Sequence, residues 1–526
     1  MIDEIVQFVV AIVCGLVLAY AIGMYMALLI EGKPRPFERI LARIEGVLFR
    51  IAGIDEDAPM TWKQYLWALL LTNALVVGFV YVVLAVQGMT SDLAFNTASS
   101  FATNTNLQHY VGETLSILSQ LGLMVGLFIA PATGFAACFA FLRCFHYTSR
   151  NVGNFYADLT RIILNILIPV AFVGAIVLLI LGAPQTLSST LTTGSLGGGT
   201  QTVSIGPVAS WESIKEFGNN GGGYFGANSA HPLENPSGLT NIVEIILMMG
   251  GGFSFPFAYG ELFGRGKGRA LLAAILAPWL FLLGFALLSP TGTLGLETRF
   301  GSFGTVLFNF TSIFSNTGAT NALLSGLSRK NVVSLFVGMF VQAIPGGEGA
   351  GFMTLIINVI LTIFLVGLMV GKTPEFLGYK IQPLEVKLAV VVFLLHPLMI
   401  LIPSAVAFGT GQVQAILGPH VTPFGYTQVL YEYTSASANN GSDYLGTLAN
   451  TPFWNFSTGI VMLVGRYAPM AFMLAIAGQF AAKDRRQVPE PINTEGVPFI
   501  MTLIGVTLLL TALAFLPFLV IGPFVM

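Results

Sequence analysis

Four short polar stretches interrupt an otherwise apolar chain of 526 residues, and we name them windows 1 to 4. They read Thr103-Asn104-Thr105-Asn106, Gly218-Asn219-Asn220-Gly221-Gly222-Gly223, Asn316-Thr317-Gly318-Ala319 and Asn439-Asn440-Gly441-Ser442. Each lies between two long apolar segments and follows a short stretch that can form a half-helix. Backbone carbonyls can replace the water shell of a monovalent cation, and glycine permits the backbone turns that aim carbonyls inward. The windows therefore predict a ring of ion-coordinating loops around one axis.

We expect the coordinating carbonyls around Asn104, Gly221, Gly318 and Gly441. Asn-Gly and Gly-Gly also form ordinary turns, which is the simpler interpretation of any single window. Four windows on one face favour a filter. No acidic ring accompanies them, which argues against divalent selectivity, and Asp443 beside window 4 fits a solvated rim equally well. The predicted filter residues are Thr103, Asn104, Thr105, Asn106, Asn219, Asn220, Gly221, Gly222, Asn316, Thr317, Gly318, Asn439, Asn440 and Gly441.

The composition is that of an integral membrane protein. Hydrophobic residues make up 55% and charged residues 9% of the chain, whereas soluble domains carry about 25% charged residues. The net charge of −2 gives no sign of nucleic-acid binding. Cys14, Cys138 and Cys144 lie in or beside apolar segments without metal-ligand spacing, so packing is favoured over a disulfide. The first apolar run is too long for a signal peptide and predicts a retained transmembrane helix.

The apolar segments predict an all-α polytopic membrane protein with one membrane domain, because about 20 helical residues cross the hydrocarbon core. The ten expected spans are 5–30, 62–87, 115–142, 159–182, 239–262, 270–289, 333–371, 384–408, 454–480 and 499–523. The seventh is interrupted by a glycine-rich break at 345–351. Backbone groups freed by such a break cannot face lipid, so we expect the break inside the protein or against a wet cavity.

Basic residues give the orientation. Alternate loops contain 18 of the 23 Lys and Arg residues, which predicts that these loops are cytoplasmic and both termini extracytoplasmic. All four windows then lie on the external side, in parallel helix–loop–helix units rather than inverted repeats. The expected divisions are 1–61 (an extra helix and a basic loop), 62–142, 159–262, 270–371 and 384–480 (repeats 1 to 4 in pseudo-fourfold arrangement) and 499–526 (a last helix). The expected pore helices are 92–102, 209–217, 302–314 and 427–438, and 184–216 is an external excursion.

Residues around the windows resemble a known family. The run 219–225 continues into Asn228-Ser229-Ala230-His231-Pro232-Leu233-Glu234-Asn235-Pro236, which is similar to the second pore loop of the potassium-binding A subunit of Kdp-type potassium-transporting ATPases. Window 1 with Gln108, and 438–442, resemble the first and fourth filters of that family. The run 371–378 resembles a cytoplasmic element after its third repeat. The likeness covers essentially the whole chain in the same order.

The resemblance implies a division of labour in a prokaryotic cell membrane. The A subunit, channel-like itself, selects K⁺, which reaches a P-type ATPase B subunit through an intramembrane tunnel. A single-span C subunit and a very small fourth subunit complete the complex. The sequence has neither a Walker-type loop nor an Asp-Lys-Thr-Gly motif, so we expect no nucleotide or organic cofactor on this chain and ATP hydrolysis elsewhere. The expected filter supports are Gln108, Asn228, His231 and Glu234, and the expected gate or coupling residues are Gly346, Gly347, Glu348, Gly349, Gly351 and Lys372.

The sequence departs from the family pattern at four places. Window 3 has Thr317 where a cysteine is usual. Leu107 takes the place of a tryptophan, which should alter packing behind window 1. Lys372 stands where an arginine is familiar, and Lys lacks the bidentate geometry of Arg. Glu348 puts a carboxylate into a break expected to be apolar, where it could pair with a cation or with Lys372.

Several other ionisable residues have two interpretations. Arg466 in the ninth span is either functional or bonded to a carbonyl. Glu244 is a similar candidate that could lie near the membrane interface, and His109 and Glu113 either line the external mouth or are solvated. His231 and Glu234 are expected to brace the loop after window 2 rather than bind metal. The basic amphipathic helix at 37–50 is expected on the cytoplasmic lipid surface, with docking to a partner as the alternative.

Two other functions stay open at this point. A K⁺ channel-like transporter could work without an ATPase. A membrane-embedded enzyme could use His231, Glu234 and Glu348, although these residues are far apart in the predicted topology. K⁺-stimulated ATP hydrolysis by a co-purified partner would separate the ATPase subunit from the first alternative, and substrate turnover by the isolated chain would favour the second.

Overall fold

The structure is a computed structural model that describes residues 2–56, 58–146, 152–195, 197–288, 297–341, 346–485 and 492–522. Within these residues the protein is mostly helical, and ten helices are long and apolar enough to cross a membrane. The expected helical, polytopic architecture is therefore confirmed at this level. Pro345 of the break and two basic loop residues, Arg150 and Arg486, lie outside the described residues.

The observed spans begin and end within a few residues of the expected ones, because long apolar runs fix them. They are α1 (Ile2–Glu31), α3 (Trp62–Val86), α5 (Ile117–His146), α6 and α7 (Phe155–Ile162 and Ile168–Ile180), α9 and α10 (Gly238–Gly252 and Phe255–Phe263), α11 (Arg265–Leu287), α14 (Ala350–Val370), α15 (Pro383–Gly409), α18 (Pro452–Ala481) and α19 (Val497–Ile521). A π-helical turn at Ile163–Leu167 joins α6 to α7, just before Pro169.

Two spans are interrupted. The seventh consists of α13 (Arg329–Val341) and α14, and the described part of the break between them is buried. The expectation that this break lies inside the protein is therefore confirmed. The fifth span also ends and restarts, since Phe253 and Ser254 separate α9 from α10. The sequence analysis missed this second interruption, although three consecutive glycines at 250–252 precede it and glycine weakens a helix interior.

Four short helices precede the windows: α4 (Ser91–Ala102), α8 (Val208–Phe217), α12 (Gly301–Phe314) and α17 (Pro423–Ala438). They agree with the four expected pore helices to within a few residues. Most of their residues are buried next to the windows. In α8, for example, nine of the ten residues are buried, and Ser210 is half-buried. A polar half-helix can be buried in this way because it bonds its own backbone groups.

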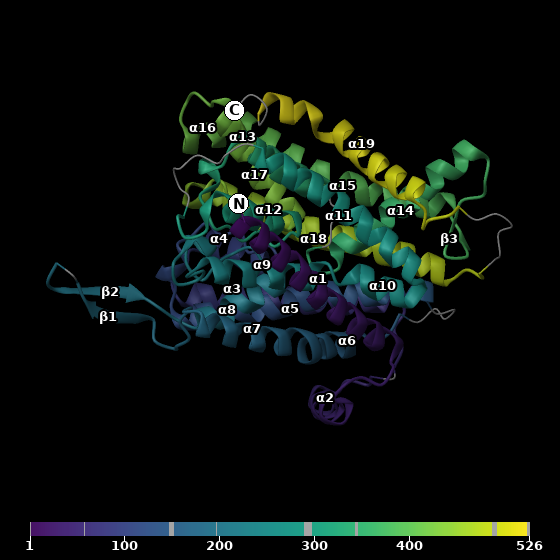
Figure 1. The fold of residues 1–526 in the computed structure, drawn as a ribbon, viewed down its shortest axis with the longest axis horizontal. Coiled ribbons are helices and arrows are strands. Elements are labelled where there is room, and N and C mark those ends of the chain that lie inside the picture. Colours follow the sequence, from purple (N-terminus) through teal and green to yellow (C-terminus); the bar gives the residue numbers. More distant parts are fainter. Residues whose placement is uncertain are drawn as a thin grey trace.

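The two ends of the molecule differ (Figure 1). Helix α1 begins and α19 ends toward the end that also carries a hairpin of β1 (Thr190–Gly194) and β2 (Thr200–Ser204), which lies within the predicted excursion. The opposite end carries α2 (Glu38–Ala52) and the small hairpin of β3 (Glu375–Phe376) and β4 (Tyr379–Lys380). The remaining elements are α16 (Gln412–Leu417) and five short helical turns, η1 (Gly112–Thr114), η2 (the turn at Ile163–Leu167), η3 (Asn228–Ala230), η4 (Leu324–Gly326) and η5 (Gly446–Ala449).

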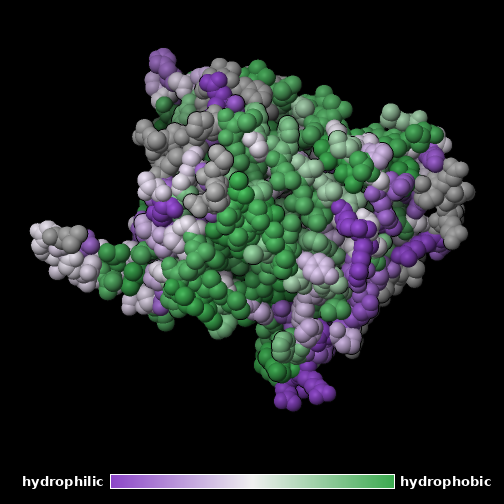
Figure 2. Space-filling model, viewed as in Figure 1, coloured by the Kyte–Doolittle hydropathy of each residue, from purple (hydrophilic) through white to green (hydrophobic). Residues whose placement is uncertain are grey.

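The surface matches a membrane protein. Hydrophobic side chains cover the middle of the face in Figure 2, and hydrophilic ones gather toward the end that carries α2 and β3. On α3, for instance, Trp67, Leu71 and Leu75 are all more than half exposed. Exposed apolar side chains along a spanning helix are stable against lipid, whereas an apolar belt of this size on a soluble protein would drive association.

Candidate ion-binding site

Each of the four short helices ends in the same backbone turn. The turn places an asparagine in the left-handed region: Asn104 at φ 63°, Asn219 at φ 49°, Asn316 at φ 55° and Asn439 at φ 55°. Asparagine tolerates this region better than most residues because its short side chain bonds locally. The shared turn sets a common register, in which 103–106 corresponds to 218–221, 315–318 and 438–441.

This register changes one expectation. Asn106, rather than Asn104, corresponds to Gly221, Gly318 and Gly441. Asn106 has φ 56°, and the glycines at 318 and 441 have φ 87° and 96°. The residues alone did not give this register, because window 1 contains no glycine to align with the other windows. Its Asn-x-Asn pattern offers two asparagines, Asn104 and Asn106, that could take the glycine position. Window 1 meets the same backbone requirement with asparagine.

Side-chain amides connect window 1 to window 2 and window 2 to window 3. Asn104 Nδ2 donates to the carbonyls of Gly218 and Asn219 at 3.0 and 2.8 Å. Asn219 Nδ2 donates to Thr317 Oγ1 at 2.8 Å. The hydroxyl that stands in place of the familiar thiol in window 3 is therefore a hydrogen-bond acceptor here, and it holds that window against its neighbour.

Window 4 completes the circle. Asn440 Nδ2 donates to the Ile313 carbonyl at 3.0 Å and to Asn316 Oδ1 at 3.3 Å, which connects window 4 to window 3. Asn439 Nδ2 donates to Thr105 Oγ1 at 3.0 Å, which connects window 4 to window 1. Adjacent windows are thus joined all the way round, in chain order, by buried asparagine amides.

The backbones approach one another inside this circle. The Gly221 amide donates to the Thr105 carbonyl at 3.1 Å. A Cβ on Gly221 would lie 2.6 Å from the Asn440 carbonyl oxygen and 2.7 Å from Gly441 Cα, so a side chain cannot be accommodated there. A Cβ on Gly318 would fall on the Asn440 carbonyl. The close approach requires glycine at both positions, and at Gly318 the positive φ requires it as well.

The donor set is neutral oxygen. Carbonyl groups of Thr105 and Asn440 face neighbouring windows, and the side-chain oxygens of Asn106 and Asn220 are buried without a hydrogen-bond partner among the described residues. The nitrogen of each of these two amides also lacks a partner in the described part of the chain, and buried polar groups left over in this way point to a ligand. A weakly hydrated monovalent cation suits such oxygens, because they offer dipoles without a fixed charge.

Four predicted support residues hold window 2 from behind. Asn228 Nδ2 donates to the Gly221 carbonyl at 2.7 Å, and Gln108 exchanges hydrogen bonds of 2.9 and 3.1 Å with the Gly223 carbonyl and amide. Glu234 accepts from the Phe225 amide at 2.6 Å. The His231 ring stacks on Phe225, with centroids 3.7 Å apart. Each of the four predicted support residues therefore contacts window 2 or the loop that follows it.

A buried charge cluster behind window 2 was missed by the sequence analysis. Lys215 Nζ lies 2.6 Å from Glu212, 3.1 Å from Glu216 and 3.4 Å from Glu234, and all four side chains are fully buried. Burial raises the pKa of Glu234 to about 8, although the Lys215 ammonium opposes this shift. The available signal in the sequence was the presence of three acidic residues and one basic residue in a short predicted pore helix and the loop after it. That many charges in a buried helix indicate a charge cluster.

Glu244 belongs to the same buried region. Its side chain is fully buried, and one carboxylate oxygen lies within 4.8 Å of those of Glu212 and Glu216. The α9 helix begins at Gly238, which puts Glu244 two turns into the span and beside the short helix α8 rather than at the surface.

The predicted gate residues lie at the foot of window 3. A Cβ on Gly346 would fall on the Ser315 carbonyl, and a Cβ on Gly349 would lie 2.8 Å from the Gly134 carbonyl oxygen. Arg466 NH1 donates to the Gly347 carbonyl at 2.6 Å. Of the two interpretations of Arg466, the structure therefore supports the bond to a carbonyl, made to the break itself. Gly351 closes the turn through a 3.1 Å bond from its amide to the Gly346 carbonyl.

Glu348 is near the filter but far from Lys372. Its carboxylate lies against Gly251 in α9 and is fully buried, without a hydrogen-bond partner among the described residues. Lys372 follows the far end of the 21-residue helix α14, which at 1.5 Å per residue separates the two by about 30 Å. The suggested Glu348–Lys372 pair is therefore wrong, and Lys372 lies away from the other gate residues.

His109 is neither solvated nor open to the external mouth. It is fully buried, with Nε2 3.0 Å from Glu432 Oε1 and Nδ1 2.7 Å from Asn455 Oδ1. Burial lowers the pKa of His109, but the Glu432 carboxylate beside it outweighs burial and leaves that pKa raised. Glu113, in contrast, is exposed and accepts from the Gly226 amide at 2.6 Å. Asp443 is half-buried rather than fully solvated.

Comparisons with known proteins agree with this geometry. Residues 9–526 match the model of the KdpA family, described as "Potassium-transporting ATPase A subunit". A curated relative from Geobacillus kaustophilus, the potassium-transporting ATPase potassium-binding subunit, is 40% identical, and the match covers 98% of each chain. The chain belongs to the KdpA family.

The fold of this KdpA chain is shared with a solved K⁺ transporter. The crystal structure of TrkH from Vibrio parahaemolyticus is similar with a TM-score of 0.55 and 14% identity, over 90% of this chain and 97% of that one. The chain is a multi-span membrane subunit of a potassium-transporting ATPase. ATPase activity belongs to the complex, which confirms the expectation that this KdpA subunit is not an enzyme by itself. Membership disfavours both alternatives, the ATPase-independent transporter and the membrane enzyme.

Proposed function

We propose that windows 1 to 4 form the K⁺ selectivity filter of the ATPase complex and bind K⁺ from the extracytoplasmic side. The observation that carries this proposal is the closed circle of asparagine amides around the windows. A filter must hold its oxygens at fixed separations to distinguish K⁺ from Na⁺, and cross-bonds between adjacent loops supply that rigidity. Neutral carbonyl and amide oxygens bind K⁺ weakly enough for it to leave.

The short helices strengthen this site. α4, α8, α12 and α17 all end where a window begins, so the negative ends of their dipoles point toward a cation held between the windows. We propose that each belongs to one of four repeats, 62–142, 159–262, 270–371 and 384–480, arranged around a pseudo-fourfold axis. On this proposal the segments 1–61 and 499–526 contribute two extra helices outside the repeats.

The break at 346–351 is proposed to close the path below the filter. Its turn lies against the Ser315 carbonyl, directly after α12, and Arg466 fixes it through the Gly347 carbonyl. An ion leaving the windows would meet this turn and the buried Glu348 carboxylate. The turn then limits leakage to the cytoplasm and directs K⁺ sideways, through an intramembrane tunnel, to the P-type ATPase B subunit. Lys372, at the cytoplasmic end of α14, is proposed to act in coupling rather than at the gate.

The proposed assembly also contains a single-span C subunit and a very small fourth subunit, in a prokaryotic cell membrane. Both termini are proposed to be extracytoplasmic. They share one end of the molecule with the β1–β2 hairpin, while the basic loops lead to the other end (Figure 1), which supports this orientation. This chain is proposed to take part through bound K⁺ and lipid alone, without a nucleotide or organic cofactor.

Replacing Gly221 by Asp tests the filter. The new Cβ would stand 2.6 Å from the Asn440 carbonyl oxygen and bring a carboxylate among neutral oxygens. In the complete complex we expect Gly221→Asp to abolish high-affinity K⁺ stimulation of ATP hydrolysis, or to degrade discrimination against Rb⁺ and Na⁺. Assembly of the complex is checked by co-purification of the ATPase subunit. An assembled variant with unchanged K⁺ affinity and selectivity would overturn the assignment.

A further inference from the structure

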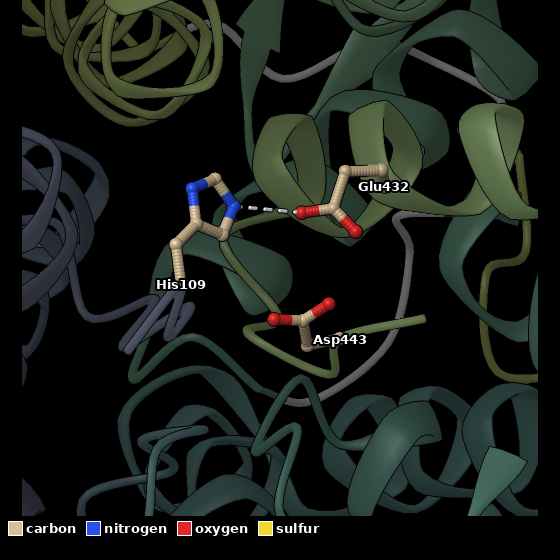
Figure 3. Close-up of side chains that lie close together, drawn as sticks. All are labelled: His109, Glu432 and Asp443. Atoms are coloured by element: carbon tan, nitrogen blue, oxygen red, sulfur yellow. Dashed lines mark hydrogen bonds and ion pairs between the residues drawn. The ribbon is translucent and has the colours of Figure 1, made fainter. Parts of the chain in front are cut away.

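Three side chains that could bind a metal meet between windows 1 and 4, outside the filter (Figure 3). His109 follows window 1, Glu432 projects from α17, and Asp443 comes directly after window 4. One nitrogen or oxygen atom from each lies within 4.8 Å of the other two. Residues 109 and 443 are far apart in sequence, so the fold has brought this set together.

The orientation of His109 is fixed by hydrogen bonds. Asn455 Nδ2 donates to the Asp92 carboxylate at 2.8 Å and to Asn450 Oδ1 at 3.0 Å. Because Asp92 and Asn450 Oδ1 are acceptors, the amide must face them, and Asn455 Oδ1 is left to accept from His109 Nδ1 at 2.7 Å. The Nδ1 atom therefore carries a proton, and Nε2 makes the 3.0 Å hydrogen bond to Glu432 Oε1, so a metal bound here would replace the proton of that bond. A histidine held in this way by an oxygen on its other nitrogen is the usual arrangement of a metal ligand.

The carboxylates leave oxygens unbonded in the same place. Glu432 is fully buried, and its Oε2 atom has no hydrogen-bond partner among the described residues. In Figure 3 the free oxygen of Glu432 and the carboxylate of Asp443 point toward each other, and Asp443 Oδ2 is also without a partner in the described part of the chain. Two carboxylate oxygens that face each other in a buried site repel unless a proton or a cation lies between them.

The charges favour a cation. In the described structure the protonated His109 ring is the ion-pair partner of Glu432, and no lysine or arginine lies within ion-pair distance of Glu432 or Asp443, so Asp443 is left without a positively charged partner. Asp443 is half-buried and the other two ligands are fully buried, so the three groups are largely withdrawn from solvent. The donor set combines one imidazole nitrogen with two carboxylate oxygens, unlike the all-oxygen, uncharged set of the windows.

We propose that His109, Glu432 and Asp443 bind a divalent transition-metal cation of the Zn²⁺ class. Zn²⁺ takes histidine nitrogen and carboxylate oxygen together, with water in the remaining position, whereas K⁺, Mg²⁺ and Ca²⁺ prefer oxygen alone. The bound metal would connect window 1 to window 4, beside the amide of Asn439 that already does so. This site is separate from the filter, and its existence does not depend on the filter assignment.

Direct metal binding to the purified complete complex tests the site. The complex is treated with chelator, returned to chelator-free buffer and titrated with Co²⁺, whose visible absorption reports a nitrogen and oxygen ligand set, and with Zn²⁺ in competition. His109→Gln removes the imidazole but keeps an amide in its place, and Asp443→Asn removes one carboxylate. His420→Gln is the matched control, because His420 is an exposed histidine in the loop between α16 and α17.

We expect one Co²⁺ to bind with a visible spectrum that Zn²⁺ abolishes. His109→Gln and Asp443→Asn should each weaken binding at least tenfold, whereas His420→Gln should leave it unchanged. Two variants are used so that the test survives if one fails to assemble. Absence of bound Co²⁺ in the wild-type complex, which would mean that Glu432 and Asp443 share a proton, overturns the proposal. So does binding that is unaffected in an assembled His109→Gln or Asp443→Asn complex.

Discussion

The side-chain amide of Asn219 in window 2 donates to the hydroxyl of Thr317 in window 3 at 2.8 Å, and both residues are fully buried. The two lie 98 residues apart in sequence. This bond is one of four connections between adjacent windows, and it uses the position at which the chain departs from the family pattern. The departure is therefore accommodated by a contact that positions window 3, and it can be tested by mutation.

Replacing Asn219 by Ala should loosen the filter without unfolding the protein. The loss of a buried hydrogen bond costs about 1–2 kcal/mol, and an alanine at the left-handed φ of position 219 adds up to about 1–2 kcal/mol, so we expect at least a tenfold rise in the K⁺ concentration that half-saturates ATPase stimulation. Asn331→Ala is the control, because Asn331 is also buried but bonds Ser328 at 2.8 Å, away from the windows. Equal effects of the two variants would contradict the role of the circle. Thr317→Val should act in the same direction and be non-additive with Asn219→Ala.

Alanine variants of Gly318 and Gly411 can distinguish the effect of a steric clash from the effect of backbone strain. Both have positive φ, 87° and 76°, but a Cβ on Gly318 would fall on the Asn440 carbonyl, whereas a Cβ on Gly411 meets nothing within 4 Å. An alanine in the left-handed region costs about 1–2 kcal/mol at either site. We therefore expect Gly318→Ala to abolish high-affinity K⁺ stimulation and Gly411→Ala to change it less than twofold. Similar losses in both would show that strain alone explains the first.

Removing the Arg466 guanidinium should open a leak. Arg466→Gln loses the 2.6 Å bond to the Gly347 carbonyl and frees the turn below window 3. We expect passive K⁺ flux without ATP in proteoliposomes that contain the complete complex, measured with a K⁺-sensitive dye. Arg299→Gln is the matched control, since Arg299 also donates to a backbone carbonyl, that of Asn235 at 2.9 Å, but far from this turn. If proteoliposomes with the Arg466→Gln complex show no passive K⁺ flux, the proposal that the break acts as a gate is contradicted.

The stability of the complex should depend on pH through the protonation of His231, and it should fall as the pH is lowered. Burial lowers the pKa of His231 below its ordinary 6.5, so the folded protein disfavours the protonated ring that stacks on Phe225. The stability from the neutral ring is present above about pH 6.5 and is lost as the pH falls through the lowered pKa. We expect the thermal midpoint of the complex to fall less between pH 8 and pH 5.5 in His231→Gln than in the wild type. If His420→Gln reduces the acid loss equally, the effect does not come from His231.

Features that depend on local composition could be predicted from the residues alone. Apolar runs fixed the spans, because a helix must present about 20 such residues to lipid. Asn and Gly after a short half-helix fixed the places of the windows, because those residues end a helix in the left-handed region. The basic loops gave the expected orientation, and the runs at 219–236 and 371–378 led to the KdpA family, which the comparison with known proteins confirms.

Contacts between residues that are distant in the chain could not be predicted, because they depend on how the helices pack. Several of these relationships are long-range. One is the register that pairs Asn106 with Gly221. Another is the hydrogen bond from Asn439 to Thr105 across 334 residues, and a third is the hydrogen bond from Arg466 to the Gly347 carbonyl across 119 residues. His109 looked like a residue of the outer mouth, yet packing buries it against Glu432, 323 residues away. Such contacts depend on how helices pack around an axis, and local sequence carries no information about the distance between two residues that are far apart in the chain.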